Sequence, residues 1–220
     1  DELDWAFYQQ EYDNIHRMDR ILKAEGKSPD DYKVAKQADV LMTFFVLNEG
    51  QIKAILHELG YALPEHLLRK NFSYYLKRTS HGSTLSRLVH AYLAHVLGDY
   101  NLSWQLYTEA LKSDYIDIQG GTTKEGIHLG VMTGTVFFTL RAFAGINLDA
   151  LILEVNPSLP THWRAIRFSL SFKGCRYTFI ITTSAVKVKI DGNSENNIRV
   201  YGKNITLQPA QWHSVSNAIN

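Results

Sequence analysis

The sequence predicts an α+β protein of two parts, a helical region followed by a small all-β domain. Over residues 1–147, apolar side chains recur at helical spacing. From residue 148 to 220, short runs rich in β-branched and aromatic residues alternate with polar ones, and glycine or proline turns separate them. The composition changes near Asn147, and NPSLPTHW at 156–163 is the candidate boundary segment.

The helical pattern is clearest in STLSRLVHAYLAHVLG (83–98), where apolar residues fall at i, i+3, i+4 and i+7. Gly98 closes this helix, and Asp99 or Asn101 is placed to begin the next. The other predicted helices cover roughly 8–24, 34–48, 50–59, 64–78, 102–112 and 125–144. Short connections imply antiparallel neighbours, as in a bundle, a solenoid or part of an α/α toroid.

The second part contains six or seven predicted strands, enough for a small sandwich or barrel. In RAIRFSLSF, the apolar residues Ile166, Phe168, Leu170 and Phe172 alternate with polar ones, as in a half-buried antiparallel strand. Turns are predicted at Lys173-Gly174, Asp191-Gly192 and Gly202-Lys203-Asn204.

Charge and length exclude several partners. The 220 residues carry a formal net charge of +1, which gives no electrostatic case for nucleic-acid binding. The longest apolar run, VLMTFFVL at 40–47, is far shorter than the roughly 20 residues that cross a bilayer. Cys175 is the single cysteine, and the N-terminus lacks the pattern of a signal peptide. We therefore expect a cytoplasmic protein without membrane or nucleic-acid partners.

Common catalytic motifs are absent from the sequence. GGTTKEG places its lysine wrongly for a phosphate-binding P-loop, and His57-Glu58 lacks the second histidine of a zinc-protease motif. His81, His90 and His95 do not share metal-ligand spacing on one helix face. No metal site is expected.

Three polar segments at predicted helix starts remain as candidate sites. Lys36-Gln37-Ala38-Asp39 forms the polar head of an otherwise apolar helix. A helix that is apolar all round is expected to be deeply buried, so its head faces either an end surface or a polar cavity. TSHGSTLSRL (79–88) supplies more hydroxyls than capping requires, and free amides at a helix start make an anion site. The third is DIQGGTTKEGIHLG (117–130).

Glu125 in the third segment has two possible roles. Thr122 and Glu125 have capping-box spacing, which explains the glutamate without any chemistry. The other role is that of a catalytic carboxylate. His128 is expected one turn into the same helix, within reach of an anion held at its head.

At these segments the chain resembles glycoside hydrolase family 65, which contains inverting disaccharide phosphorylases and some hydrolases. VAKQADVLMTFFVL, TSHGSTLSRLVHAYLAHVLGDYNLSWQLYTEAL, DIQGGTTKEGIHLGVMTGT and NPSLPTHWRAIRFSLSFKGCRYTFIIT are similar to its motifs, over roughly residues 30–215. The resemblance implies the closing helices of an (α/α)6 toroid at 1–147 and a C-terminal β domain at 148–220. The family's general-acid segment has no counterpart here, so this chain alone is not expected to turn over substrate.

The resemblance also implies roles for individual residues. Lys36 and Gln37 would bind the hydroxyls of a glucose unit in an α-linked disaccharide. His81, Ser83, Thr84 and His128 would hold inorganic phosphate, the co-substrate and nucleophile, and no cofactor would be needed. The helix faces would be covered by the N-terminal part of the barrel or by self-association.

Two alternatives stay open. One is an α-glucoside hydrolase of the same family, with Glu125 as the first candidate for its base; the absence of Asp and Glu from 79–86 favours phosphorolysis. The other is a helical module without catalysis that binds carbohydrate or protein.

Overall fold

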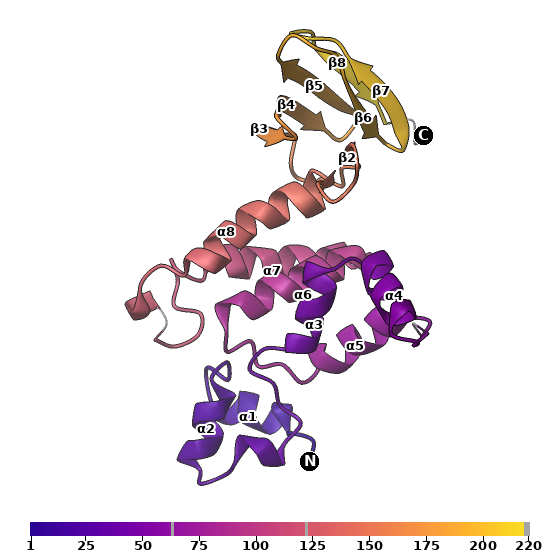
Figure 1. Ribbon diagram of the computed structural model, residues 1–220. Coiled ribbons are helices and arrows are strands. Elements are labelled where there is room, and N and C mark those ends of the chain that lie inside the picture. The colour runs from indigo at the N-terminus through magenta and orange to yellow at the C-terminus, as the bar shows by residue number, and fades with distance from the viewer. Residues whose placement is uncertain (63, 122, 218–220) are drawn as a thin grey trace. The chain divides into compact units, whose positions relative to one another are not determined.

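The computed structural model describes residues 1–62, 64–121 and 123–217 of the chain. It consists of two compact units that divide between Thr135 and Val136. The first is helical and the second consists mainly of strands, and Figure 1 traces the elements of each. The predicted fold class, helices followed by a small β domain, is confirmed.

Periodicity located the helices of the first unit well. These are α1 (Trp5–Glu11), α2 (Met18–Ala24), α3 (Asp39–Val46), α4 (Glu49–Glu58), α5 (Leu67–Leu76), α6 (Thr84–Val96), α7 (Tyr100–Lys112) and α8 (Leu129–Phe138), with 3-10 turns η1 (Pro29–Asp31) and η2 (Thr123–Glu125). The last residues of α8 and the π-helical turn η3 (Thr139–Phe143) belong to the second unit. No helix among the described residues is long and apolar enough to cross a membrane.

Three helix predictions need correction. The segment predicted as one helix over 8–24 forms two, α1 and α2. Helix α3 begins at Asp39 rather than near residue 34, because the backbone before it pairs with another segment. Helix α3 was also expected to be deeply buried, yet Val40 is 44% and Val46 60% exposed, while Leu41 and Phe44 are buried.

The turn between α6 and α7 follows the predicted chemistry. Gly98 adopts a φ of +84°, a left-handed conformation that glycine accepts readily. The Asp99 amide then donates to the Ala94 carbonyl over 2.9 Å. The Asp99 carboxylate accepts the Leu102 amide over 3.0 Å and caps α7, so the start is Asp99 rather than Asn101. This arrangement lets α6 and α7 lie side by side (Figure 1).

Asp99→Ala is expected to lower the free energy of unfolding of the helical unit by about 1 kcal/mol, because the first turn of α7 loses its side-chain acceptor. Urea denaturation followed by far-UV circular dichroism measures this change. Asn101→Ala is the matched control, with an expected change below about 0.5 kcal/mol at an exposed position. Equal effects of both substitutions would show that the cap contributes nothing.

The second unit is a sandwich of two four-stranded sheets. One has the strand order β1-β2-β6-β7 and the other β3-β4-β5-β8. The strands are β1 (Ile146–Asn147), β2 (Leu153–Val155), β3 (Ala165–Phe172), β4 (Cys175–Thr182), β5 (Ala185–Asp191), β6 (Asn196–Val200), β7 (Lys203–Leu207) and β8 (His213–Ser216). All neighbours are antiparallel except β2 and β6, which are parallel.

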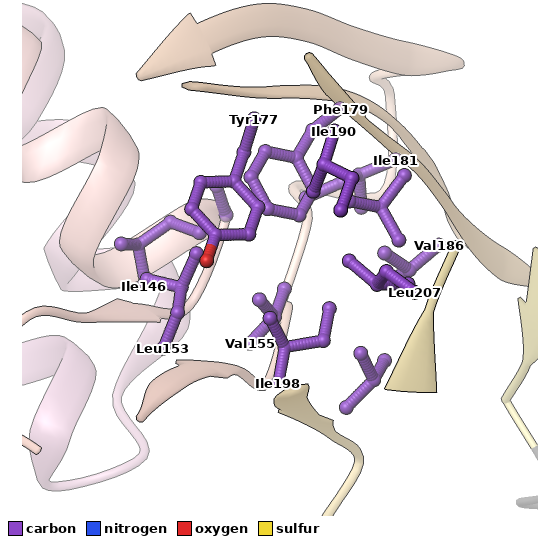
Figure 2. Packing of buried hydrophobic residues seen from close by; sticks show 13 residues of the cluster. Ile146, Leu153, Val155, Tyr177, Phe179, Ile181, Val186, Ile190, Ile198 and Leu207 are labelled. Atoms are coloured by element: carbon purple, nitrogen blue, oxygen red, sulfur yellow. The ribbon is translucent and has the colours of Figure 1, made fainter. Parts of the chain in front are cut away.

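Buried side chains from both sheets form one core. Tyr177, Phe179 and Ile181 of β4 extend from one sheet, and Val155 and Ile198 from the other (Figure 2). The side chains of β3 alternate between exposed and half-buried, as predicted from its sequence. Lys173 and Gly174 connect β3 to β4 with φ values of +48° and +78°, the two left-handed residues of a tight hairpin turn.

Candidate functional site

Backbone pairing joins two of the three predicted segments. The Ala35 amide donates to the Arg78 carbonyl over 2.8 Å, and the Ser80 amide donates to the Ala35 carbonyl over 2.9 Å. The Gly82 amide then donates to the Lys36 carbonyl over 3.0 Å. Ala35 and Thr79 thus form an isolated parallel bridge. This bridge and the Gly82–Lys36 bond hold the Lys36-Gln37 segment beside the loop that leads into α6.

Gly82 is required for this close approach. A Cβ atom at residue 82 would lie 2.4 Å from the His16 carbonyl oxygen and 3.0 Å from Cγ of Lys36. The first distance is far below any real contact of a Cβ atom, and its partner is backbone. Glycine at this position therefore lets three separate segments of the chain pack together.

The third predicted segment reaches the same loop through Gln119. Its side-chain amide donates to the His81 carbonyl over 2.9 Å, and Gln119 is buried. The Asn14 side chain donates to the carbonyl of Ile118, the residue before Gln119, over 3.2 Å. The structure thus brings parts of all three segments together in the helical unit.

The head of α6 has no side-chain cap. Ser83 occupies the N-cap position, and its hydroxyl makes no capping hydrogen bond. Within the described part of the chain, the amides of Ser83, Thr84 and Leu85 also have no hydrogen-bond partner. Free amides and the helix dipole give a helix start a preference for anions. An anion bound at this position would accept hydrogen bonds from the amides that no side chain caps.

His81 lies at the bend before this helix head, with a left-handed φ of +54°. Its Nδ1 is 3.0 Å from the Ser86 hydroxyl, and its ring packs edge-on against His90 at 4.7 Å between centroids. Burial, together with His90, Arg87 and His16, lowers the pKa of His81 to about 2. At neutral pH the imidazole is therefore uncharged and can act only through hydrogen bonds.

Lys36 and Gln37 precede α3 instead of lying in its first turn. Lys36 is exposed, and the Gln37 amide donates to Asp39 Oδ1 over 2.7 Å. Gln37 and Asp39 line a small cavity together with Ser86 and His90 of α6. His90 Nδ1 lies 2.8 Å from the Ser86 carbonyl, so it carries the proton. Its Nε2 is then an acceptor, buried without a partner among the described residues.

His128 is placed differently from the prediction. It precedes α8, and its carbonyl accepts the Val131 and Met132 amides. The Asp114 carboxylate accepts the backbone amide of His128 and approaches its Nδ1, both at 2.6 Å. Asp114, in the turn after α7, therefore fixes the residue that precedes α8, a role that no local sequence pattern predicted.

The capping box predicted at residues 122 and 125 includes Thr122, which lies outside the described residues. The helix that it was expected to begin starts at Leu129, so that start is corrected by four residues. Glu125 ends the turn η2, its side chain is 57% exposed, and its Oε2 is 3.7 Å from His128 Nε2. That His128 acts together with His81, Ser83 and Thr84 stays a prediction.

Arg87, which sequence reasoning missed, is a charged group 1% exposed behind this loop. Its Nε donates to Glu109 over 3.0 Å and its Nη1 to the His81 carbonyl over 3.0 Å. Its Nη2 lies 3.1 Å from Nε2 of His16. The periodic pattern of α6 gives no sign of this, because Arg87 lies between positions that the pattern assigns to the core. Among the described residues, no group of three or more His, Cys, Asp or Glu side chains is suited to hold a metal.

Comparison with known proteins identifies the family. Residues 1–137 match the central catalytic domain of glycosyl hydrolase family 65, and residues 149–207 match its C-terminal domain. The chain belongs to glycosyl hydrolase family 65 and covers the C-terminal part of that architecture.

Several relatives are named as disaccharide phosphorylases. The trehalose 6-phosphate phosphorylase of Lactococcus lactis subsp. lactis (strain IL1403) is 40% identical over 94% of this chain and 27% of its own length. The kojibiose phosphorylase of Thermoanaerobacter brockii is 31% identical over 81% of this chain and 22% of its own. A solved structure of a putative kojibiose phosphorylase from human microbiome matches with a TM-score of 0.67 at 25% identity, covering 86% of this chain and 26% of that one. The chain thus spans about a quarter of the length of these relatives.

Proposed function

We propose that the protein carrying this chain is an inverting phosphorylase of α-linked glucose disaccharides. Inorganic phosphate is the nucleophile and no cofactor takes part. In an inverting reaction, an acid protonates the glycosidic oxygen that leaves, while the nucleophile attacks the anomeric carbon from the opposite face. The resemblance assigns the acid to a segment without a counterpart in these residues. This chain then supplies the glucose-binding and phosphate-binding groups.

The observation that carries this proposal is the uncapped head of α6 beside Lys36. The amides of Ser83, Thr84 and Leu85 have no partner in the described chain, and the Gly82–Lys36 hydrogen bond joins this loop to the segment that we propose binds glucose. Phosphate oxygens accept hydrogen bonds from amides and hydroxyls. His81 adds a neutral imidazole, and the hydroxyls of Ser83 and Thr84 add further donors.

The names of the relatives support the substrate class. Trehalose phosphorylases and kojibiose phosphorylases cleave α-linked glucose disaccharides with phosphate, and such enzymes are among the proteins similar to this chain. The relative with 40% identity is named for trehalose 6-phosphate, so this phosphorylated disaccharide is the first substrate to try.

Hydrolysis is the alternative, and one observation favours it. The Glu125 carboxylate is mostly exposed and lies 3.7 Å from His128, whose other ring nitrogen contacts Asp114. An exposed carboxylate near a histidine is suited to activate water. The proposal of phosphorolysis therefore needs a test that separates the two nucleophiles.

The full-length protein is expected to release β-glucose 1-phosphate from trehalose 6-phosphate, trehalose or kojibiose, and only when inorganic phosphate is present. The β anomer follows from inversion of an α linkage. NMR spectra of the first products identify the anomer and the phosphate ester. Glu125→Gln is expected to retain this activity to within about threefold, because in phosphorolysis the solution supplies the nucleophile. Release of free glucose without phosphate, abolished by Glu125→Gln, would establish the hydrolase instead.

A further inference from the structure

Three side chains, two buried and one half-buried, hold the loop before α6 from behind, and none of them lies in the loop's own sequence run of 79–84. They are Arg87, His16 and Gln119, here called the carbonyl clamp. His16 Nδ1 lies 2.9 Å from the Ser80 carbonyl, and Arg87 and Gln119 both donate to the His81 carbonyl. Each member comes from a different region of the helical unit, so the loop is fixed by tertiary contacts.

The contacts of His16 define its tautomer. A carbonyl oxygen only accepts, so Nδ1 carries the proton and donates to Ser80. Nε2 is then a lone pair, and it accepts from Nη2 of Arg87 over 3.1 Å. An arginine only donates, so both hydrogen bonds of this ring require the neutral form. His16 thus links the Arg87 guanidinium to the Ser80 carbonyl through two hydrogen bonds, so the position of one constrains the other.

Arg87 is anchored at its other side. Glu109 Oε2 accepts from Nε over 3.0 Å, and Gln105 donates to the second oxygen of the same carboxylate over 3.1 Å. The guanidinium is thereby fixed against α7, and its two terminal nitrogens reach the loop and His16. A planar guanidinium with fixed donors holds partners in a defined geometry, which a lysine does not.

The clamp determines how the backbone enters α6. Two donors on the His81 carbonyl hold that residue in its left-handed conformation, which is unfavourable for a residue with a side chain. The next residues, Gly82 and Ser83, then turn toward Lys36 and begin the uncapped helix head. Without the clamp, His81 would be free to leave its left-handed conformation. The amide and hydroxyl donors at the head of α6 would then no longer keep their relative positions.

We propose that the carbonyl clamp is a positioning device for the phosphate site: Arg87, His16 and Gln119 set the geometry of the loop without touching the ligand. This inference rests on the proposed function, because phosphate binding at the head of α6 is its readout. Lowering the pH provides a second readout. A protonated His16 can no longer accept from Arg87, and it then faces the positive guanidinium, with Glu109 and neutral His81 as the other titratable groups around it.

The decisive comparison is His16→Gln with His16→Leu in the full-length protein. Glutamine has a donor and an acceptor for both partners of His16, whereas leucine has neither. His16→Leu is expected to raise the KM for inorganic phosphate about tenfold or more, since it leaves two buried polar groups unpaired. The KM for the disaccharide is expected to change less than about threefold. His16→Gln is expected to restore the phosphate KM to within about threefold of the wild-type value.

The pH profile separates positioning from a general loss of structure. Burial lowers the pKa of His16 below its usual 6.5, although the Ser80 carbonyl opposes this shift. Wild-type phosphate affinity is therefore expected to weaken as pH falls below that lowered value, where the ring gains its proton. His16→Gln cannot gain one. The phosphate KM of the wild type divided by that of His16→Gln is then expected to rise at acidic pH. The titration of phosphate itself affects both KM values equally and cancels in this ratio.

Gln119→Leu provides a second variant should His16→Leu not fold, as judged by its thermal unfolding. It removes the other donor to the His81 carbonyl and is expected to raise the phosphate KM in the same way. If the enzyme uses phosphate and both His16→Leu and Gln119→Leu keep the wild-type KM for phosphate, the positioning role of the clamp is overturned while the proposed function stands. A wild-type protein that neither binds inorganic phosphate in a titration nor releases glucose 1-phosphate would overturn the proposed function and the clamp with it.

Discussion

Gly145→Ala is expected to lower the free energy of unfolding of the β unit by about 4 kcal/mol or more, because the added methyl group would clash with backbone atoms. Losses of this size come only from such severe disruptions. Gly145 has a φ of +64°, and a Cβ atom there would lie 1.9 Å from the Asn156 carbonyl oxygen. It would also lie 2.7 Å from the Pro157 nitrogen. The Gly145 carbonyl accepts the Asn156 amide over 2.9 Å, so the two segments cannot separate without losing that bond.

The matched control is Gly202→Ala. Gly202 also has a left-handed φ, +74°, but nothing lies within 4 Å of a Cβ atom at that position. Alanine there is expected to cost only about 1–2 kcal/mol, the usual penalty for the left-handed conformation. Denaturation followed by near-UV circular dichroism reports on the aromatic core around Tyr177 and Phe179. Similar losses for both variants would mean that backbone crowding at Gly145 is not the cause.

Gly82→Ala is expected to abolish phosphate-dependent turnover and to destabilise the helical unit by roughly 3 kcal/mol, the upper end for overpacking a closed site. The added methyl group would force the His16 backbone and the Lys36 side chain away from the loop. Because His16 belongs to the carbonyl clamp, this displacement also disturbs the Ser80 carbonyl. Turnover is measured as glucose 1-phosphate release, and stability by urea denaturation.

Gly130→Ala tests whether the effect is specific to residue 82. Gly130 lies in α8 with nothing within 4 Å of a Cβ atom and no left-handed φ. Gly130 is the second residue of α8, and alanine is a better helix former than glycine, so this variant is expected to be as stable as the wild type or slightly more so. A Gly82→Ala protein with normal stability and normal turnover would show that the three segments do not depend on this close approach.

Helix locations followed from periodicity, but helix starts often did not. The start of α8 is four residues later than predicted, and the amide of His128, the residue just before the helix, donates to Asp114, a partner 14 residues earlier. Similarly, α3 starts after Gln37 because residues 35 and 36 pair with the loop at 78–82. In both cases the helix begins next to a contact between separate segments, which no local sequence pattern reveals.

The strands show a related limit. The longer strands β3, β4 and β5 were evident, because seven or eight residues display alternation clearly. Six or seven strands were predicted, and the described part of the unit has eight. Strands β1 and β8, of two and four residues, are too short for alternation to be recognised in the sequence. Pairing with longer neighbours, rather than any propensity of their own, defines them.

Sequence reasoning predicted three candidate segments, but not how they meet. Lys36, Gln37 and the run from His81 to Thr84 were marked by polar residues at helix starts. Arg87 and His16 were missed, since a buried arginine in a helix and a histidine in a polar stretch look ordinary. The role of His16 appears only because the fold brings the Ser80 carbonyl, 64 residues along the chain, beside its ring, where Arg87 also reaches it. The roles of the predicted residues in binding stay predictions.

The carbonyl clamp also bears on what kind of ligand the loop can recognise. The carbonyls of Ser80 and His81 are both occupied by side-chain donors, whereas the amides at the start of α6 have no partner in the described chain. The loop therefore presents unpaired hydrogen-bond donors, while its Ser80 and His81 carbonyl acceptors are already bonded. It discriminates by hydrogen-bond polarity: a group rich in acceptor oxygens finds unpaired amide donors there, whereas an ammonium group finds the Ser80 and His81 carbonyls already bonded.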